Sequence, residues 1–480
     1  MAQLTVQSAG RGVGRWFLIA LVAAEVTSSL EVTMVYTALP SLTRIFHDPA
    51  AVGWIITACL LVSAAAAALC GRLGDLYGHR RLLLIVLMFC VFGSFISAFS
   101  TRLEFIILGA SLQGASGAVL PLCLALVRLH AEPERVPPTI GLLLAFATGT
   151  AALGLAVGGF LVDHAGWNSI FVVSGSWALV GWLMTWRFVP ALRAPAERER
   201  DSIDMVRGIL FVPAITGLLL SVSLAKDHGG DVRIILLAIG SAVLLAFWIR
   251  HQLAQQHPLI HLHAFSDRRV AAACFCMAMV GLGMTQHTLI LGMLLQQGGG
   301  VGFGLAAATA GALLMPVRLI GTLSSAVTGR LILRYGAPYA LLLGAAMASA
   351  GWAMILLFRP YLPVVMVGML LEGAAYLICY VAVPNILLEA TPPERAGEVT
   401  GLSTVFRAAF SAIGAQMVML LLSIRNEIPP GAAHAQPSVF SYQLGLIFIL
   451  GACLSCTFVA WRLARGSRPI PMATASEGSA

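Results

Sequence analysis

Long apolar stretches, separated by short segments of Pro, Gly or charged residues, run through the whole chain. About fourteen of them reach the roughly 20 residues that a helix needs to cross the hydrocarbon of a bilayer. The pattern therefore predicts an all-α integral membrane protein whose two termini lie on the same side. The predicted spans are residues 16–39, 52–71, 82–100, 104–127, 138–162, 168–189, 207–225, 232–250, 270–295, 304–328, 339–358, 362–388, 397–424 and 441–464.

Composition agrees with this pattern and excludes an ordinary soluble enzyme. Of the 480 residues, 59% are hydrophobic and 10% are charged, whereas soluble domains carry charge on about 25% of their residues. The net charge of +8 does not indicate nucleic-acid binding, because the basic residues form no clustered face with aromatic side chains. The expected surrounding is the lipid bilayer, and no nucleic acid is an expected partner.

The distribution of basic residues predicts the orientation of the chain. The two tails and alternate loops hold 21 of the 29 Arg and Lys residues, and the opposite loops hold six. Cytoplasmic loops of membrane proteins carry the excess of basic residues. Both termini are therefore expected in the cytoplasm.

An internal repeat lies in two of the predicted cytoplasmic loops. Gly71-Arg72-Leu73, three further residues and Tyr77-Gly78 recur as Gly329-Arg330-Leu331, three residues and Tyr335-Gly336. Transporters are commonly built from related halves, so we expect two bundles with two extra helices between them. The predicted parts are an N-terminal tail 1–15, a six-helix bundle 16–189, a linker 190–206, two inserted helices 207–250, a loop 251–269, a six-helix bundle 270–464 and a C-terminal tail 465–480.

The first copy of the repeat, Gly71–Arg81, resembles the signature loop between the second and third helices of the major facilitator superfamily. Its glycines permit a tight turn, and its arginines favour the cytoplasmic surface. The resemblance implies the major facilitator fold, with two six-helix bundles and, in this chain, two inserted helices. It also implies a conformational latch formed by Gly71, Asp75, Gly78, Arg80 and Arg81.

Further motifs and the number of spans narrow the resemblance to the fourteen-helix drug:proton antiporters. Leu30-Glu31-Val32-Thr33 is similar to their first-helix motif, with Glu31 where an Asp is usual. Leu112-Gln113-Gly114 resembles the second family motif, and Gly154 with Gly158-Gly159 resembles the antiporter motif. Together these motifs imply proton-coupled transport.

Two residues depart from these motifs. Ala110 stands where the family normally carries an Arg, and Leu155 replaces a Pro of the antiporter motif. The overall resemblance covers residues 16–464. It implies a multidrug-efflux type of transporter in the cell inner (plasma) membrane, which exports a hydrophobic or amphipathic small molecule against inward proton flow by alternating access. Neither a cofactor nor a metal is expected.

Ionisable side chains inside the spans are the candidate functional groups, because a charge near the bilayer centre costs about 2.5–3.5 kcal/mol. The resemblance implies that spans one, four, nine and twelve line the central cavity. Glu25 in span one is expected to be structural. The proton-coupling candidates are Glu31, Glu372 and His287, and the candidates for the substrate cavity are Gln113, Arg318, Arg407 and Tyr376.

Several alternatives stay open at this level. Arg318 and Arg407 either pair with Glu31 and Glu372 or hold a substrate carboxylate or phosphate. The second arrangement is typical of an importer or facilitator of a small organic anion. A rival from another class is a non-transporting membrane sensor. An enzyme is not expected, since the sequence shows no arrangement of nucleophile, base and oxyanion stabiliser.

Overall fold

The computed structural model of the chain divides into two compact units. The first contains the residues up to Ile249 together with Gly304–Met315, and the second contains Arg250–Phe303 and the residues from Pro316 onward. The structure describes residues 15–130, 132, 136–190, 210–228, 231–254, 267–298, 301–390, 396–427 and 436–466. Most of the predicted tails, of the linker 190–206 and of the loop 251–269 lie outside these ranges.

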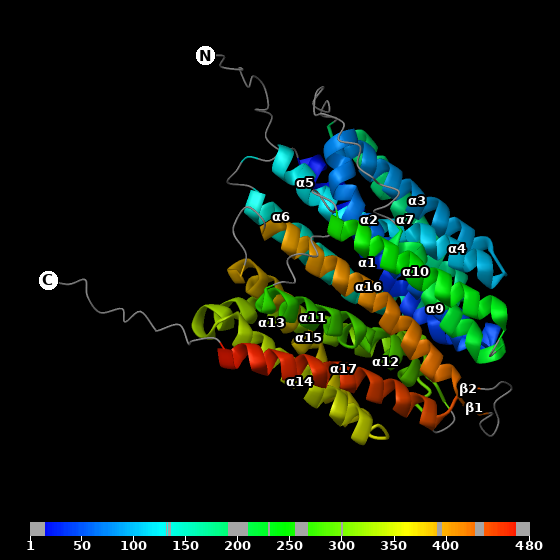
Figure 1. Ribbon diagram of the computed structural model, residues 1–480. Coiled ribbons are helices and arrows are strands. Elements are labelled where there is room, and N and C mark those ends of the chain that lie inside the picture. Colours follow the sequence, from blue (N-terminus) through cyan, green and yellow to red (C-terminus); the bar gives the residue numbers. More distant parts are fainter. Residues whose placement is uncertain are drawn as a thin grey trace, which may run out of the picture. The chain divides into compact units, whose positions relative to one another are not determined.

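Helices occupy every predicted span (Figure 1), which confirms the all-α membrane architecture. Up to residue 254 they are α1 (Arg15–Phe46), α2 (Pro49–Tyr77), α3 (His79–Phe99), α4 (Leu103–Gln113), η1 (Gly114–Ala118), α5 (Val119–His130), α6 (Val136–Ala165), α7 (Asn168–Phe188), α9 (Phe211–His228) and α10 (Val232–Ala254). After residue 267 they are α11 (Arg268–Leu282), η4 (Met284–Gln286), α12 (His287–Gln296), α13 (Ala307–Tyr335), α14 (Ala337–Leu357), α15 (Leu362–Ala390), α16 (Ala396–Ser423) and α17 (Val439–Gly466).

Two short strands complete the described structure. β1 (Asn426–Glu427) pairs antiparallel with β2 (Gln436–Pro437), just before α17 begins.

Thirteen helices of the described chain are long and apolar enough to cross a membrane. In this count α4, η1 and α5 form one span, as do α11, η4 and α12. The predicted span 207–225 corresponds to α9, which is not among the thirteen. Its last turn carries Lys226, Asp227 and His228, so the polar end shortens its apolar stretch.

The two copies of the repeated loop motif build the same turn. Gly78 follows α2 with a φ of 92°, and Gly336 follows α13 with a φ of 90°. Each glycine N–H donates to the carbonyl four residues earlier, at 2.9 Å to Gly74 and 2.8 Å to Ile332. Glycine adopts a positive φ without steric cost, so the motif ends one long helix and allows the next to begin directly.

A second pair of equivalent contacts follows this turn in each unit. In the first unit a Cβ added to Gly93 of α3 would lie 2.5 Å from the carbonyl oxygen of Gly109 in α4. In the second unit a Cβ on Gly351 of α14 would lie 2.7 Å from the carbonyl oxygen of Gly368 in α15. Small residues at such crossings let helix backbones approach closely in a membrane. The two units therefore repeat both a turn and the helix crossing beside it.

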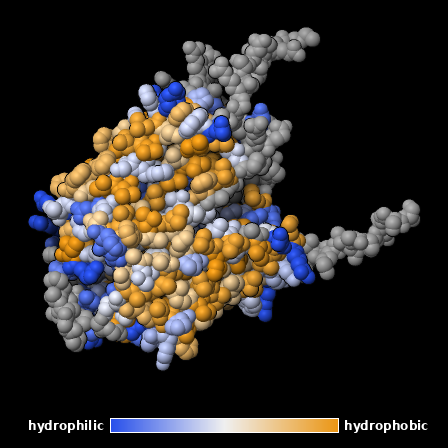
Figure 2. Space-filling model, turned by 180° about the vertical axis from the view of Figure 1, so that it is seen from behind, coloured by the Kyte–Doolittle hydropathy of each residue, from blue (hydrophilic) through white to orange (hydrophobic). Residues whose placement is uncertain are grey.

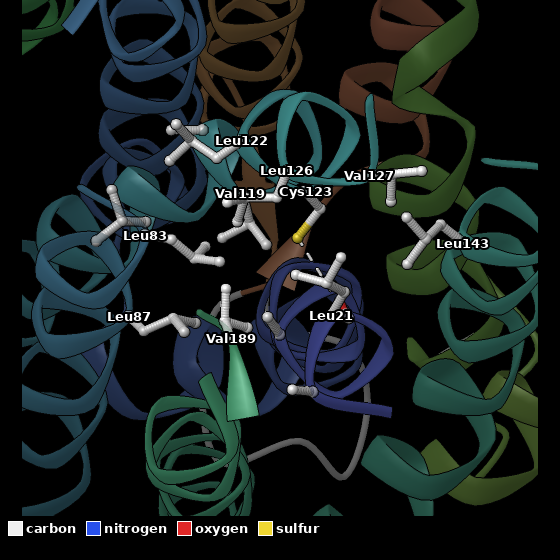
Figure 3. Packing of buried hydrophobic residues seen from close by; sticks show 14 of the residues in the cluster. Leu21, Leu83, Leu87, Val119, Leu122, Cys123, Leu126, Val127, Leu143 and Val189 are labelled. Carbon is white, nitrogen blue, oxygen red and sulfur yellow. Dashed lines mark hydrogen bonds between the residues drawn. The ribbon is translucent and has the colours of Figure 1, made fainter. Parts of the chain in front are cut away.

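An apolar core holds α1, α3 and α5 together in the first unit. Leu21, Leu83 and Leu122 are fully buried in it, and the Sγ of Cys123 approaches the Leu21 carbonyl oxygen at 3.8 Å (Figure 3). Lipid is as apolar as these side chains, so close packing is what holds helices together within a bilayer.

The outer surface of the helices suits contact with lipid. Leu236 and Val243 on α10 are each 62% exposed, and Leu323 on α13 is 69% exposed. Figure 2 shows hydrophobic side chains over most of one face. Exposed apolar surface of this extent is unfavourable in water and natural in acyl chains.

Asp163 of α6 caps the start of α13 within the first unit. Its carboxylate accepts hydrogen bonds from the backbone N–H groups of Ala307 at 3.1 Å and Ala308 at 2.7 Å. Helix N-termini leave such N–H groups unsatisfied and favour a negative partner. Pro316, where α13 passes into the second unit, lacks the N–H that would continue the helical hydrogen bonds.

We expect Gly93→Ala and Gly351→Ala each to lower the free energy of unfolding by about 1–3 kcal/mol, because the added methyl group forces two helix backbones apart. Thermal unfolding of the purified protein in detergent measures the loss. Gly451→Ala on α17 is the matched control, since a Cβ there meets no atom within 4 Å. A Gly93→Ala variant as stable as this control would contradict the close crossing.

Candidate functional site

A buried chain of polar side chains crosses the first unit from α1 to α4. Glu31 on α1 is 2% exposed. The Ser94 hydroxyl of α3 donates to Glu31 Oε1 at 3.4 Å, and the Gln113 amide of α4 donates to the Ser94 oxygen at 2.8 Å. Ser174 of α7 adds a hydroxyl 3.5 Å from Ser94. Glu31 is thus connected to Gln113 through one serine.

Glu31 also lies beside an interruption of its neighbouring span. Between α4 and α5 the chain forms the 3₁₀ segment η1, which touches α1. Ser116 of η1 and Cys90 of α3 lie against the Glu31 carboxyl group. A 3₁₀ stretch within a longer helix often marks a hinge or a strained site. The acid therefore contacts the segment of span four that can most easily change its winding.

Glu25 lies apart from this chain of polar contacts. Its Oε1 accepts a hydrogen bond from the Ser28 hydroxyl at 3.1 Å, and that hydroxyl also lies 2.9 Å from the Glu25 carbonyl oxygen. Its side chain is buried near Cys123 in the apolar core. These local contacts agree with the structural role expected for Glu25.

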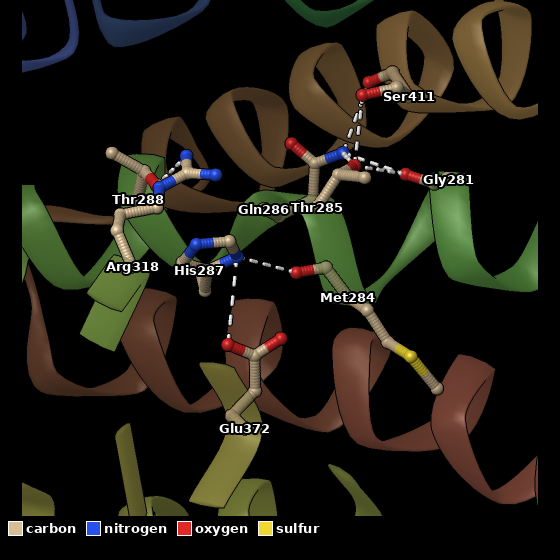
Figure 4. Close-up of polar contacts among 9 residues, drawn as sticks. All are labelled: Gly281, Met284, Thr285, Gln286, His287, Thr288, Arg318, Glu372 and Ser411. Carbon is tan, nitrogen blue, oxygen red and sulfur yellow. Dashed lines mark hydrogen bonds and ion pairs between the residues drawn. The ribbon is translucent and has the colours of Figure 1, made fainter. Parts of the chain in front are cut away.

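The second unit buries a histidine–glutamate pair (Figure 4). His287 Nδ1 lies 3.5 Å from Glu372 Oε2 and 2.8 Å from the carbonyl oxygen of Met284. A carbonyl oxygen only accepts hydrogen bonds, so Nδ1 carries a proton. His287 Nε2 has no hydrogen-bond partner among the described residues. A second proton on this atom would make an imidazolium, which Glu372 could neutralise.

This pair also lies at an interruption of a span. Met284 belongs to η4, and His287 is the first residue of α12. The Gln286 amide donates to Gly281 O at 2.9 Å and to Ser411 O of α16 at 3.0 Å. The bond to Gly281 O satisfies a carbonyl group at the break, which a continuous helix would satisfy by itself, and the bond to Ser411 O connects the break to α16.

Arg318 and Arg407 make no ion pair with a carboxylate in the part of the chain that the structure describes. Arg318 Nη2 donates to the Thr288 hydroxyl at 2.7 Å. The Arg407 guanidinium lies over the Tyr380 ring, 5.2 Å from its centroid, and close to the hydroxyls of Tyr376 and Tyr380. Within the second unit, Arg318 interacts with Glu372 electrostatically without forming an ion pair.

Aligning Gly78 with Gly336 relates the two polar clusters. One helical turn after the crossing glycines, α4 carries Gln113 and α15 carries Glu372. The acid lies on the first span of one bundle, and on the fourth span of the other. In both units an acid on a continuous helix contacts the 3₁₀ break of its neighbour, since α1 touches η1 and α15 touches η4.

The predicted latch loop is almost entirely helical: residues 71–77 continue α2, α3 begins at His79, and only Gly78 lies between the two helices. The side chain of Asp75 lies outside the described part of the structure, as does that of Arg72. Arg80 Nη2 donates to the Trp186 carbonyl oxygen at 2.7 Å, near the end of α7. A cation at a helix C-terminus satisfies carbonyl groups there. Gly71 lies within α2, and Arg81 is exposed.

The rarity of charge in the spans predicted the ionisable residues of these clusters but not their hydroxyl partners. Ser94 and Thr288 were not predicted, and neither were η1 and η4. Serine and threonine are common in the spans, and most bond to a carbonyl of their own helix, as Ser111 does to Ile107 at 2.7 Å. The glycines of Gly114-Ala115-Ser116-Gly117 were the available signal for η1.

A family description of the Major Facilitator Superfamily matches residues 21–415. The chain belongs to the major facilitator superfamily. The fold expected from the loop motif is thereby confirmed, and this major facilitator protein is a multi-pass membrane transporter.

Its relatives within the superfamily are of two kinds. It is 27% identical over 423 residues to the uridine/deoxyuridine transporter of Lactococcus lactis subsp. cremoris (strain MG1363), covering 84% of this chain and 85% of the relative. It is 28% identical over 395 residues to the multidrug resistance protein Stp of Mycobacterium tuberculosis (strain CDC 1551 / Oshkosh), covering 80% of this chain and 71% of the relative.

A solved structure agrees on the fold. The xylose transporter XylE from E. coli, in a partially occluded inward-open conformation, is similar with a TM-score of 0.61 at 12% identity, covering 95% of this chain and 99% of that one. At this identity the likeness establishes the major facilitator fold and no more.

Removing the serine that connects Gln113 to Glu31 tests the first cluster. We expect Ser94→Ala to cost about 1–3 kcal/mol of stability, because the Gln113 amide stays buried without its acceptor. Adding Gln113→Leu removes the second partner, so the double variant is expected to recover much of the loss. Thermal unfolding of all four proteins measures the coupling. Purely additive losses would contradict the hydrogen bond.

Proposed function

We propose that this transporter is a proton-coupled exporter of a hydrophobic or amphipathic small molecule, working by alternating access. The observation that carries the proposal is the position of Glu31. It is buried within a membrane-spanning helix, is not paired with a base among the described residues, and touches the break in span four. A carboxyl group in this setting changes the local energy strongly when it gains or loses a proton.

Protonation of Glu31 would act directly on its hydrogen bonds. The ionised carboxylate accepts a hydrogen bond from the Ser94 hydroxyl. It can accept another from the hydroxyl of Ser116, which lies against it. The neutral acid instead carries a proton that it must donate. When that proton sits on Oε1, the Ser94 hydroxyl accepts from Glu31 and turns its own hydrogen elsewhere, which disturbs its contact with the Gln113 amide at the end of α4. Proton binding thereby biases the winding of η1, which gives the two conformations different stabilities.

His287 and Glu372 are the second candidate site for protons. The His287 ring and the Glu372 carboxyl group lie together beside η4, as Glu31 lies beside η1. A proton arriving at Nε2 of His287 would convert a neutral imidazole beside an ionised Glu372 into an ion pair. Each bundle thus combines a titratable group with an interrupted helix.

The relatives support transport of a small organic molecule. One is named for multidrug resistance and one for uridine and deoxyuridine. A proton moving down 100 mV supplies about 2.3 kcal/mol, which is enough to drive accumulation roughly fiftyfold. We further propose that the protein lies in the cell inner membrane with both termini in the cytoplasm, as the distribution of arginine predicts.

A second candidate direction is uptake of a small organic anion. The observation that favours it is that Arg318 and Arg407 form no ion pair with an acid of the described chain. Positive groups free of a fixed counter-ion at membrane depth commonly mark a substrate pathway.

Flux through Glu31→Gln in proteoliposomes tests the proposed function. The compound for this assay is the one that most stabilises the purified protein in a thermal screen of nucleosides, aromatic acids and aromatic amines. An imposed proton gradient should drive its export by the unchanged protein. The variant should lose the roughly fiftyfold gradient-driven accumulation yet keep exchange of labelled for unlabelled compound, which requires no net proton movement.

Glu104→Gln is the matched control, because Glu104 lies in an exposed pair with Arg102 at 3.6 Å. Reversing the gradient distinguishes export from uptake. If flux by the unchanged protein ignores the proton gradient, or if Glu31→Gln follows it as before, proton coupling through Glu31 is wrong.

A further inference from the structure

Three helices of the second unit present a partly exposed layer of arginine and tyrosine, here named the Arg–Tyr face. It consists of Arg318 on α13, Tyr376 and Tyr380 on α15, and Arg407 on α16. All four side chains are only partly buried, whereas Glu372 and His287 beside them are 0% and 2% exposed. The ionisable groups of this unit therefore form two layers, with the positive charges in the accessible one.

The guanidinium groups of Arg318 and Arg407 both interact with Tyr376. Tyr376 interacts electrostatically with both Arg318 and Arg407, and its ring stacks against Tyr380 at 6.0 Å between centroids and 19° between planes. The centroid of its ring also lies 5.9 Å from that of the His287 ring. The result is a partly exposed aromatic surface that two guanidinium groups adjoin.

The donor capacity of this face is only partly used. Each guanidinium has five N–H donors, and the Nε atoms of both Arg318 and Arg407 have no hydrogen-bond partner within the described ranges. The acceptors that they do have are hydroxyl groups, which carry no charge. Glu372, the acid on the same helix as the tyrosines, pairs with His287 at 3.5 Å and interacts with Arg318 electrostatically without forming an ion pair.

The charge of the face stays positive in either protonation state of Glu372, because two arginines outnumber one carboxyl group. A cation would be repelled here, and an anion attracted, more strongly than in water. Guanidinium groups bind planar carboxylates through paired hydrogen bonds, and tyrosine rings stack on flat aromatic ligands.

We propose that the Arg–Tyr face binds the acid group and the ring of an aromatic carboxylate, which names the substrate class of the transporter proposed above and rests on that function. The carboxylate engages Arg407 and Arg318, and the ring lies against Tyr376 and Tyr380. Neutral acceptor-rich rings such as uridine, and aromatic cations, are the alternatives that the test separates.

Three probes that share one ring and differ in charge test this class. They are naphthoate, naphthalenemethanol and naphthylmethylammonium, with uridine as a neutral heteroaromatic comparison. The shift in thermal unfolding of the full-length protein in detergent is measured against probe concentration, which yields a Kd for each. Naphthoate is expected to bind at least tenfold more tightly than the alcohol, and the amine not to bind.

Variants of the face locate the site. Arg407→Gln and Arg318→Gln should each raise the Kd of naphthoate by about tenfold to one hundredfold, since each removes charged hydrogen bonds. Arg407→Lys keeps the charge but loses the planar fork, so an intermediate loss is expected. If Arg407→Gln unfolds, Arg407→Lys replaces it as the test of this position. Arg462→Gln is the matched control, because Arg462 is exposed and lies over Phe458 at 4.7 Å.

The outcomes separate this inference from the proposed function, because binding is measured without any gradient. Tighter binding of the alcohol, uridine or the amine than of naphthoate, no shift with any probe, or an equal loss in Arg462→Gln would each overturn the aromatic-acid assignment. Arginine-dependent binding of naphthoate without proton-driven flux would instead leave the assignment standing and remove proton coupling. Proton-driven flux of an aromatic amine with no naphthoate binding would leave proton coupling standing and remove the aromatic-acid assignment.

Discussion

The high cost of placing a carboxyl group at membrane depth governs how both units are built. A charged side chain there costs about 2.5–3.5 kcal/mol unless it finds polar partners. A continuous helix offers none from its backbone, because its N–H and C=O groups bond to one another within the helix. Glu31 and Glu372 each lie where a neighbouring span is interrupted, at η1 and η4. The interruption brings the Ser116 hydroxyl to Glu31 and the His287 imidazole to Glu372. The burial of the acid and the break in the helix are therefore two parts of one solution.

The two units place the acid and the helix break on opposite spans. The turns at Gly78 and Gly336 show that the bundles follow one backbone plan. In the first unit, however, the acid is on the first span and the break on the fourth, while in the second the break is on the first and the acid on the fourth. The contact between the first and fourth spans is kept, and the chemistry on its two sides is reversed. Repetition of backbone thus leaves each half free to carry different chemistry.

Hydropathy was sufficient to predict the spans, because a bilayer demands about 20 apolar residues whatever surrounds them. It does not fix helix ends, which depend on local caps. α2 begins three residues earlier than its predicted span, where the Asp48 side chain accepts from the N–H groups of Ala50 and Ala51 at 2.9 and 3.1 Å. Candidate ionisable residues were found because charge is rare in the spans. Ser94 and Thr288 were not, since their partners come from other helices and leave no pattern in the sequence.

The distribution of charge favours substrate binding in the second unit and proton coupling in the first. Linkage requires that a proton which strengthens the binding of a ligand is itself bound more strongly when the ligand is present. A proton on Glu372 makes the Arg–Tyr face more positive, so it would favour an anion and travel with it. Export against inward proton flow needs the opposite, a proton that opposes the loaded state. Glu31 lies among serines and a cysteine in the first unit and is not a member of the Arg–Tyr face, and in the proposed mechanism its protonation would bias the winding of η1. An exporter of anions would therefore use Glu31 for coupling and keep Glu372 in one protonation state, held by His287.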